Sequence, residues 1–279
     1  MSRACLTRNL ACVAIVLVVV LRATAAQAFA CLQINGRCVR WVQHGATLRA
    51  FLGSPAPGTV LLNGTLNWDQ NAINAANDWN SVGAAFRFTV TVGGQFFDPC
   101  GPRGPNHACP NTGPVGDNPI FFAGDFCGSG FGDVIELTNN CAERTSGALL
   151  NAPVLVNANV DWNAYDGDIR VVNGRVLNDV RRVLLHEFGH VLGLDHPDDN
   201  GQDVVAIMNS REGNIDRLQS DDIGGILSIY PNSVANSGDG SGSGCQTSVV
   251  GAAGSGWLLL LPAALALLHG RRRHRRRGP

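Results

Sequence analysis

The sequence predicts one folded domain of the α/β class, in which helices pack against a sheet. Between Cys38 and Pro231 the apolar residues recur at every second position, then at about every 3.6 positions, and then at every second position again. Segment 86–92 alternates apolar and polar side chains, as a strand does. Segment 68–80 instead places its apolar residues on one helical face. Both periods within one stretch indicate helix and sheet in a single domain.

The strands are expected in both halves of the domain, at 41–51, 86–92, 133–139 and 153–163. Between the second and third of these, residues 98–132 are dense in Gly, Pro and Cys. Such a composition is too irregular for a helix or strand, and the stretch is too long for an ordinary connection. We therefore expect a surface insertion held by disulfides within a Cys-rich region around 98–141.

Two helices are expected after the last strand. Asn178 can cap a helix that runs to Val191 or Leu192. The final helix follows Ser220, another capping residue, and has acidic residues in its first turn, where the helix dipole favours them. Pro231 ends this helix. Its expected buried stripe consists of Ile223, Ile226, Leu227 and Tyr230.

The N-terminal segment 1–28 is predicted to be a signal peptide. Two arginines precede an apolar run over 10–21, and Ala26-Gln27-Ala28 supplies the small residues of a cleavage site. The alternative, an uncleaved anchor helix, is disfavoured because this run is short for a hydrocarbon core of about 30 Å. Export of the domain is therefore expected.

The C-terminal segment is predicted to anchor the domain at the cell surface. A Gly- and Ser-rich linker, 233–248, precedes the region 249–279, in which an apolar stretch of membrane-spanning length is followed by an Arg-rich tail. Positive flanks stay on the cytoplasmic side, which leaves the domain outside. The order of Gly-Cys245, apolar helix and arginines resembles the myxobacterial type of bacterial C-terminal sorting tag; a plain single-pass anchor is the alternative.

Charge and cysteine content restrict the function further. All 22 acidic residues lie between Asp69 and Asp239, so the exported domain is acidic and nucleic acid is not an expected partner. The chain has no lysine, which excludes Schiff-base chemistry.

The domain keeps six cysteines, an even number that predicts disulfides in an exported protein. Sequential pairing would close three local loops, but six cysteines allow fifteen connectivities. A zinc cluster is disfavoured because no C-x-x-C pair is present.

Residues 186–196, HEFGHVLGLDH, carry the expected chemistry. His186 and His190 are four residues apart, so on a helix they share one face and can reach one metal ion. Gly193 allows the chain to leave the helix and turn back, which brings His196 round as a third ligand. Three protein ligands leave one coordination position open, as in catalytic zinc sites. Glu187 is then placed to act as a general base on a zinc-bound water.

The stretch resembles the signature of the metzincin family, H-E-x-x-H-x-x-G-x-x-H, at every fixed position. Met208, within AIMN at 206–209, resembles the methionine turn that lies beneath the metal in that family. The Trp-containing first helix, the segment 159–163 and the closing segment 221–226 look most like the matrixin branch. The resemblance extends from about residue 41 to residue 231.

The resemblance implies a zincin-like α+β catalytic domain over 29–232. Its expected architecture is a twisted mixed, mainly parallel sheet, a helix that carries two metal ligands, and a small C-terminal subdomain that ends in a helix. It implies one catalytic Zn²⁺ and hydrolysis of internal peptide bonds in protein or peptide substrates. A substrate would add to the edge 133–139 as an antiparallel strand.

Some features depart from this pattern. Pro197 directly after the third histidine is more like the serralysin branch, and no cysteine-switch propeptide precedes Trp41. Asp166 and Asp168 offer hard oxygen ligands of the kind that Ca²⁺ binds, although an ordinary acidic turn is the favoured interpretation.

Two other functions stay open from the sequence. One is a catalytically silent binding or adhesion module with the same fold, which the intact Glu187 disfavours. The other is a zinc hydrolase that acts on a bond other than a peptide, which substrate profiling would distinguish.

Overall fold

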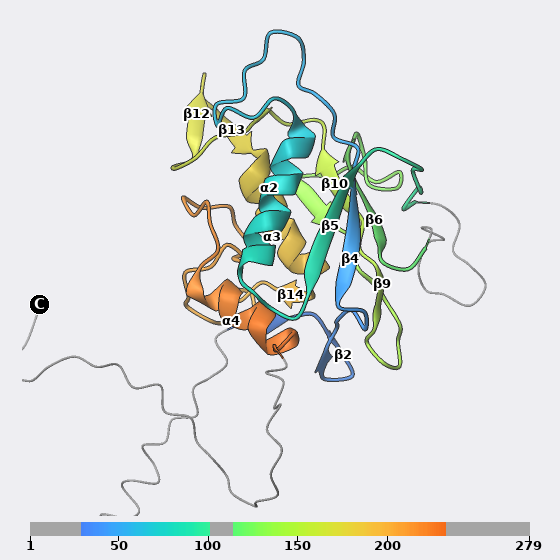
Figure 1. Ribbon diagram of the computed structural model, residues 1–279. Coiled ribbons are helices and arrows are strands. Elements are labelled where there is room, and N and C mark those ends of the chain that lie inside the picture. Colours follow the sequence, from blue (N-terminus) through green and yellow to red (C-terminus); the bar gives the residue numbers. More distant parts are fainter. Residues whose placement is uncertain (1–28, 101–113, 233–279) are drawn as a thin grey trace, which may run out of the picture. The chain divides into compact units, whose positions relative to one another are not determined.

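The computed structural model describes residues 29–100 and 114–232, and Figure 1 shows the arrangement of its helices and strands. The expected signal peptide 1–28, linker 233–248 and anchor with its Arg-rich tail 249–279 lie outside the described residues. In the described part of the chain, no helix is long and apolar enough to cross a bilayer.

A five-stranded sheet forms the centre of the domain, with the strand order β5-β4-β6-β10-β7. In chain order these strands are β4 (Gly45–Ala50), β5 (Arg87–Val92), β6 (Asp117–Ala123), β7 (Glu136–Thr138) and β10 (Val154–Asn157). The first three and β10 pair in parallel, whereas β7 runs antiparallel to β10 at the edge. The expected α/β class with a mixed, mainly parallel sheet is confirmed.

The interpretation of 98–132 as wholly irregular is wrong, because strand β6 lies within this range and in the middle of the sheet. The Gly, Pro and Cys residues around it hide it in the sequence, and Pro119 argues against a central strand. The carbonyl groups of Gly116 and Ile120 accept hydrogen bonds from the β4 side. The nitrogen of Pro119 therefore faces the β10 side, where pairing begins only at Ile120. The missing N–H thus removes no hydrogen bond from the sheet.

Helices α2 (Trp68–Ser81) and α3 (Val180–Val191) lie side by side against the sheet (Figure 1). Three fully buried alanines of α2 allow the close approach: Ala72, Ala75 and Ala76. The indole N–H of Trp79 donates to the carbonyl of Leu185 at 2.9 Å, which joins the two helices directly. The helix expected over 68–80 is confirmed.

Helix α3 is capped by Asp179 and not by Asn178 as expected. The Asp179 carboxylate accepts from the N–H of Arg181 at 3.2 Å. The Asn178 amide instead donates to the carbonyl of Asp161 at 3.0 Å, so it stabilises the preceding strand. Asn and Asp are equally good capping residues, and tertiary contacts decide between these neighbours.

The other strands are short and form small sheets: β1 (Ala30–Cys31), β2 (Gln33–Ile34), β3 (Arg37–Cys38), β8 (Cys141–Ala142), β9 (Leu149–Asn151), β11 (Trp162–Asn163), β12 (Arg170–Val172), β13 (Arg175–Asp179) and β14 (Leu194–Asp195). The strand expected over 153–163 is divided into β10 and β11. The Asn157 side chain accepts from the N–H of Asn159 at 2.9 Å, and this local bond turns the chain out of the sheet.

Helix α4 (Ser220–Ile229) closes the domain, with Gln219 rather than Ser220 at its N-cap. The buried residues at its C-terminal end are Ile226, Ile229 and Tyr230, whereas Leu227 is 36% exposed. The expected stripe is displaced because the helix presents Gly225 to the interior, where Leu194 and Phe29 approach it closely.

The disulfides are only partly those of sequential pairing. Cys31 pairs with Cys38 across the β2–β3 hairpin, and Cys100 pairs with Cys127. The second bond skips Cys109, which lies outside the described residues, and Cys141 is also disulfide-bonded. The expectation of disulfides rather than a cysteine zinc cluster is confirmed for these residues.

Candidate active site

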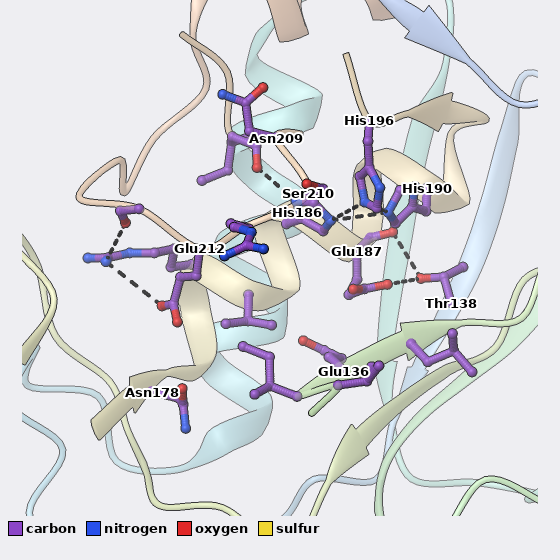
Figure 2. Close-up of a pocket in the computed structure, with 18 of the residues that line it drawn as sticks. Glu136, Thr138, Asn178, His186, Glu187, His190, His196, Asn209, Ser210 and Glu212 are labelled. Atoms are coloured by element: carbon purple, nitrogen blue, oxygen red, sulfur yellow. Dashed lines mark hydrogen bonds and ion pairs between the residues drawn. The ribbon is translucent and has the colours of Figure 1, made fainter. Parts of the chain in front are cut away.

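The three expected metal ligands and Glu187 line one cleft between the edge strand β7, helix α3 and the loop that precedes α4 (Figure 2), whereas Met208 is buried behind its lining. The cleft has a volume of about 1220 Å³. His186, Glu187 and His190 come from α3, and His196 comes from the turn that follows β14. The helix, the turn and the sheet edge therefore meet at one point.

The three histidines converge through their Nε2 atoms. The distances are 3.1 Å between His186 and His190, 3.0 Å between His190 and His196, and 3.2 Å between His186 and His196. Tetrahedral ligands at ~2.0–2.1 Å from zinc would be about 3.3 Å apart. Among the described residues, this is the only group of three or more His, Cys, Asp or Glu that could hold a metal ion.

The opposite ring nitrogens fix the orientation of these histidines. The Nδ1 atoms of His186 and His190 donate to the carbonyl groups of Ile207, at 2.8 Å, and Leu194, at 2.9 Å. The third histidine, His196, faces the Asp199 carboxylate at 3.1 Å. A proton on each Nδ1 leaves all three Nε2 lone pairs facing one another, which is favourable only with a cation between them. The donor set therefore fits zinc.

Burial, and next the neighbouring His190, lower the pKa of His186 to about 3. Neutral imidazole is the form that binds a metal ion. His186 is thus held ready for coordination over the whole neutral pH range.

The turn to the third histidine depends on Gly193, as expected. Its φ of +94° lies in the left-handed region that favours glycine. A Cβ atom there would lie 2.3 Å from the carbonyl oxygen of Val39. Both the conformation and the space therefore require glycine, and the chain turns directly into β14 and His196.

Met208 is buried and lies against α3, the helix that carries two of the histidines. A Cβ atom on Gly189 would lie 2.1 Å from the Met208 sulfur, so the glycine provides the space that the methionine fills. The Asp222 carboxylate accepts from the N–H groups of Ile207 and Met208 at 3.0 and 3.2 Å. Helix α4 thereby fixes the methionine turn, a role of Asp222 that its position in the first turn of a helix did not reveal.

Glu187 is buried, with its carboxylate directed toward strand β7 (Figure 2). The hydroxyl of Thr138 donates to Glu187 Oε2 at 2.6 Å. Because Thr138 and Glu187 are far apart in the sequence, the spacing of the HExxH stretch could not predict this partner.

A second group of charged residues borders the same cleft and was missed from the sequence. Arg182 of α3 is 2% exposed and lies 3.8 Å from both Asp179 and Glu212. Burial raises the pKa of Asp179 to about 6 and that of Glu212 to about 7. Glu136 of β7 is also buried, and burial followed by the charges of Glu187 and Glu212 raises its pKa well above the usual range. The one indication of this group in the sequence is that Arg182 lies four residues before His186 and therefore on the same face of the helix.

The calcium expectation gains no support. Asp166 and Asp168 are exposed, and they belong to no group of described residues that could hold an ion. The N–H of Gly167 between them donates to the Asp216 carboxylate at 2.7 Å, which joins this turn to the loop that precedes α4.

Comparison with protein families gives one result. The family model described as Matrixin matches residues 58–231 of the chain, which include the histidines, Glu187 and Met208. A comparison with curated proteins finds no match.

Proposed function

The chain belongs to the matrixin family, and we propose that it is an exported, surface-anchored zinc-dependent endopeptidase in which Glu187 is the general base. The observation that carries the proposal is the convergence of three histidine Nε2 atoms beside a buried glutamate, in a cleft along an open sheet edge. No one of these three features alone would indicate hydrolysis, but together they provide a metal site, a base and room for a chain.

The metal would be held by His186, His190 and His196. Zinc, when bound, supplies a Lewis acid that polarises the peptide carbonyl and lowers the pKa of water. Glu187 accepts the proton of the attacking water and later gives it to the leaving amine. Thr138 holds one carboxylate oxygen of Glu187 and leaves the other oxygen free for that proton.

Strand β7 offers the main-chain groups that a peptide would need. The N–H of Asn157 donates to the carbonyl of Ile135, and the N–H of Asn139 donates to the carbonyl of Pro153, both at 2.9 Å. The main-chain groups of Ile135 and Asn139 therefore face β10. Residues alternate in direction along a strand, so the main-chain groups of Glu136 and Thr138 face away from β10. No described strand pairs with this edge. An extended peptide can therefore add there as an antiparallel strand.

Export and anchoring rest on the segments 1–28 and 249–279 of the sequence. The disulfides Cys31–Cys38 and Cys100–Cys127 support export, because such bonds persist mainly in oxidising compartments. Fractionation of cells, followed by detection of the protein before and after protease treatment of the intact surface, tests this part of the proposal.

The test of catalysis is hydrolysis of a generic unfolded protein by the zinc-loaded chain, with and without a zinc chelator. The Glu187→Ala variant is assayed in parallel, together with its zinc content. We expect chelator-sensitive cleavage by the native chain, and none by the variant, which retains its zinc. Failure of a folded, zinc-loaded chain to cleave any protein or peptide would contradict the proposal and favour a binding module or a hydrolase of another bond.

A further inference from the structure

Glu136 is a buried carboxyl group without a partner. It is 5% exposed, and neither of its carboxyl oxygens has a hydrogen-bond partner among the described residues. It lines the same cleft as the histidines. Figure 2 shows its side chain extending from β7 toward the space bordered by Glu187, Glu212 and Asn178. Buried polar atoms are normally satisfied, so this carboxyl group indicates a ligand that supplies hydrogen-bond donors.

The charges around the cleft specify the sign of that ligand. Arg182 is already engaged: it lies 3.8 Å from Asp179 and from Glu212, and it donates to the carbonyl groups of Gly213 and Gly167. The charges that act most strongly on Glu136 are the carboxylates of Glu187 and Glu212, both of its own sign. Over the whole cleft, the lining has six carboxyl groups and three arginines, and a cationic side chain would bring these charges closer to balance. The carboxyl groups are those of Asp133, Glu136, Asp161, Glu187, Asp195 and Glu212, and the arginines are Arg175, Arg182 and Arg211.

The direction of β7 places Glu136 relative to the reacting bond. Thr138 lies beside Glu187, and Glu136 lies two residues earlier on the same face of the strand. In an antiparallel peptide, residues nearer its C-terminus lie opposite earlier residues of β7. Glu136 would thus face the part of the substrate that follows the cleaved bond.

We propose that Glu136, supported by Glu212, selects a substrate with lysine or arginine directly after the cleaved bond. The inference rests on the proposed peptidase function and names its substrate class. An ammonium or guanidinium group in this position donates to the two free oxygens of Glu136 and offsets the carboxylates around it. An apolar side chain would leave the carboxyl group buried and unpartnered, and an acidic side chain would add a charge of the same sign.

The test begins with the zinc-loaded full chain. Its cleavage sites in a reduced and alkylated unfolded protein are mapped by mass spectrometry, and kcat/KM is measured for peptides that differ only in Lys, Arg, Leu or Glu after the cleaved bond. We expect the Lys and Arg peptides to exceed the Leu peptide at least tenfold in kcat/KM. The mapped sites should show the same preference.

The Glu136→Gln variant keeps the size of the side chain but cannot carry a charge. We expect it to lower the Lys-to-Leu ratio of kcat/KM at least tenfold. The matched control is Glu143→Gln, an exposed glutamate outside the cleft, which should keep the native ratio.

Equal or faster cleavage of the Leu peptide by the native chain would overturn the inference while leaving the peptidase function intact. An equal loss for every peptide in Glu136→Gln would also overturn it. The absence of any cleavage, including that of the unfolded protein, would instead overturn the proposed function and this inference with it. The native chain alone decides the preference if Glu136→Gln does not fold.

Discussion

The hydroxyl of Thr138 lies 2.6 Å from Oε2 of Glu187 and 3.2 Å from the main-chain carbonyl of the same residue. One side chain on the edge strand therefore holds both the side chain and the backbone of the proposed base. The Asn140 amide donates to the carbonyl of His190 at 3.0 Å, which adds a second link between this edge and the helix. The sheet edge that would receive a peptide is thus joined directly to the group that would activate water.

The first prediction concerns Thr138→Val, which replaces the hydroxyl by a methyl group of similar size. A hydrogen bond to a charged group contributes about 1.5–3 kcal/mol, so we expect kcat/KM to fall by about tenfold or more. The loss should lie mainly in kcat, because Thr138 orients the base and does not hold the metal. Steady-state kinetics on a peptide, with zinc content measured in parallel, checks this.

Thr138→Ser restores the hydroxyl and should recover most of the kcat lost in Thr138→Val. A loss that appears only in KM, or that serine does not recover, would show that Thr138 contributes to packing rather than to the position of Glu187.

The second prediction concerns the contact between the active-site helix and the methionine turn. In Gly189→Ala the new Cβ atom would lie 2.1 Å from the sulfur of Met208. Overpacking of this kind costs about 1–3 kcal/mol, so the midpoint of urea unfolding should fall. The control, Gly224→Ala, is also in a helix but is exposed and has open space around it. We expect that variant to be about 0.5–1 kcal/mol more stable. A stable Gly189→Ala protein would mean that Met208 moves without cost.

The third prediction concerns the turn that positions His196. Gly193 and Gly201 both have positive φ, +94° and +77°, but only a side chain at Gly193 would strike backbone, at Val39 O. We expect Gly201→Ala to lose about 1 kcal/mol of stability from backbone strain alone. Gly193→Ala should lose more and should also bind zinc more weakly, because His196 is displaced. Competition with a chromophoric chelator measures the affinity, and equal zinc affinity in the two variants would contradict the prediction.

The local parts of the fold and site could be predicted because they depend on neighbours in sequence. The three metal ligands can be predicted from the helical spacing of two histidines and from the glycine turn that leads to the third. Helix α2 can be predicted from the helical period of its apolar residues. Strand β6 could not be predicted, because it pairs with strands that are distant in the sequence. Its own residues, with Pro119 between glycine-rich segments, instead indicate a loop.

The charged end of the cleft was equally out of reach of the sequence. Glu136, Arg182 and Glu212 come from a strand, a helix and a loop that only the tertiary structure brings together. Each residue taken alone resembles an ordinary surface charge. The chemistry of these residues depends on their burial, and no local sequence pattern indicates burial of this kind.

The final prediction follows from the raised pKa of Glu212, about 7, which burial causes against the opposing influence of Arg182. Because the folded state holds this proton more tightly than the unfolded chain, Glu212 contributes most stability below pH ~4.5, and that contribution is lost as the pH rises through about 7. Glutamine cannot ionise. The unfolding free energy of Glu212→Gln minus that of the native chain should therefore increase between pH 4.5 and about 7, by at most ~3 kcal/mol, and then level off.

Urea unfolding of both proteins without zinc, from pH 5 to 8, measures this difference. The histidines and Asp179 titrate in both proteins, so their contribution to the difference largely cancels. The exposed Glu143→Gln variant controls for the replacement of a glutamate elsewhere. A difference that stays flat with pH would show that Glu212 is ionised in the folded protein at every pH tested and is held by Arg182 as an ion pair.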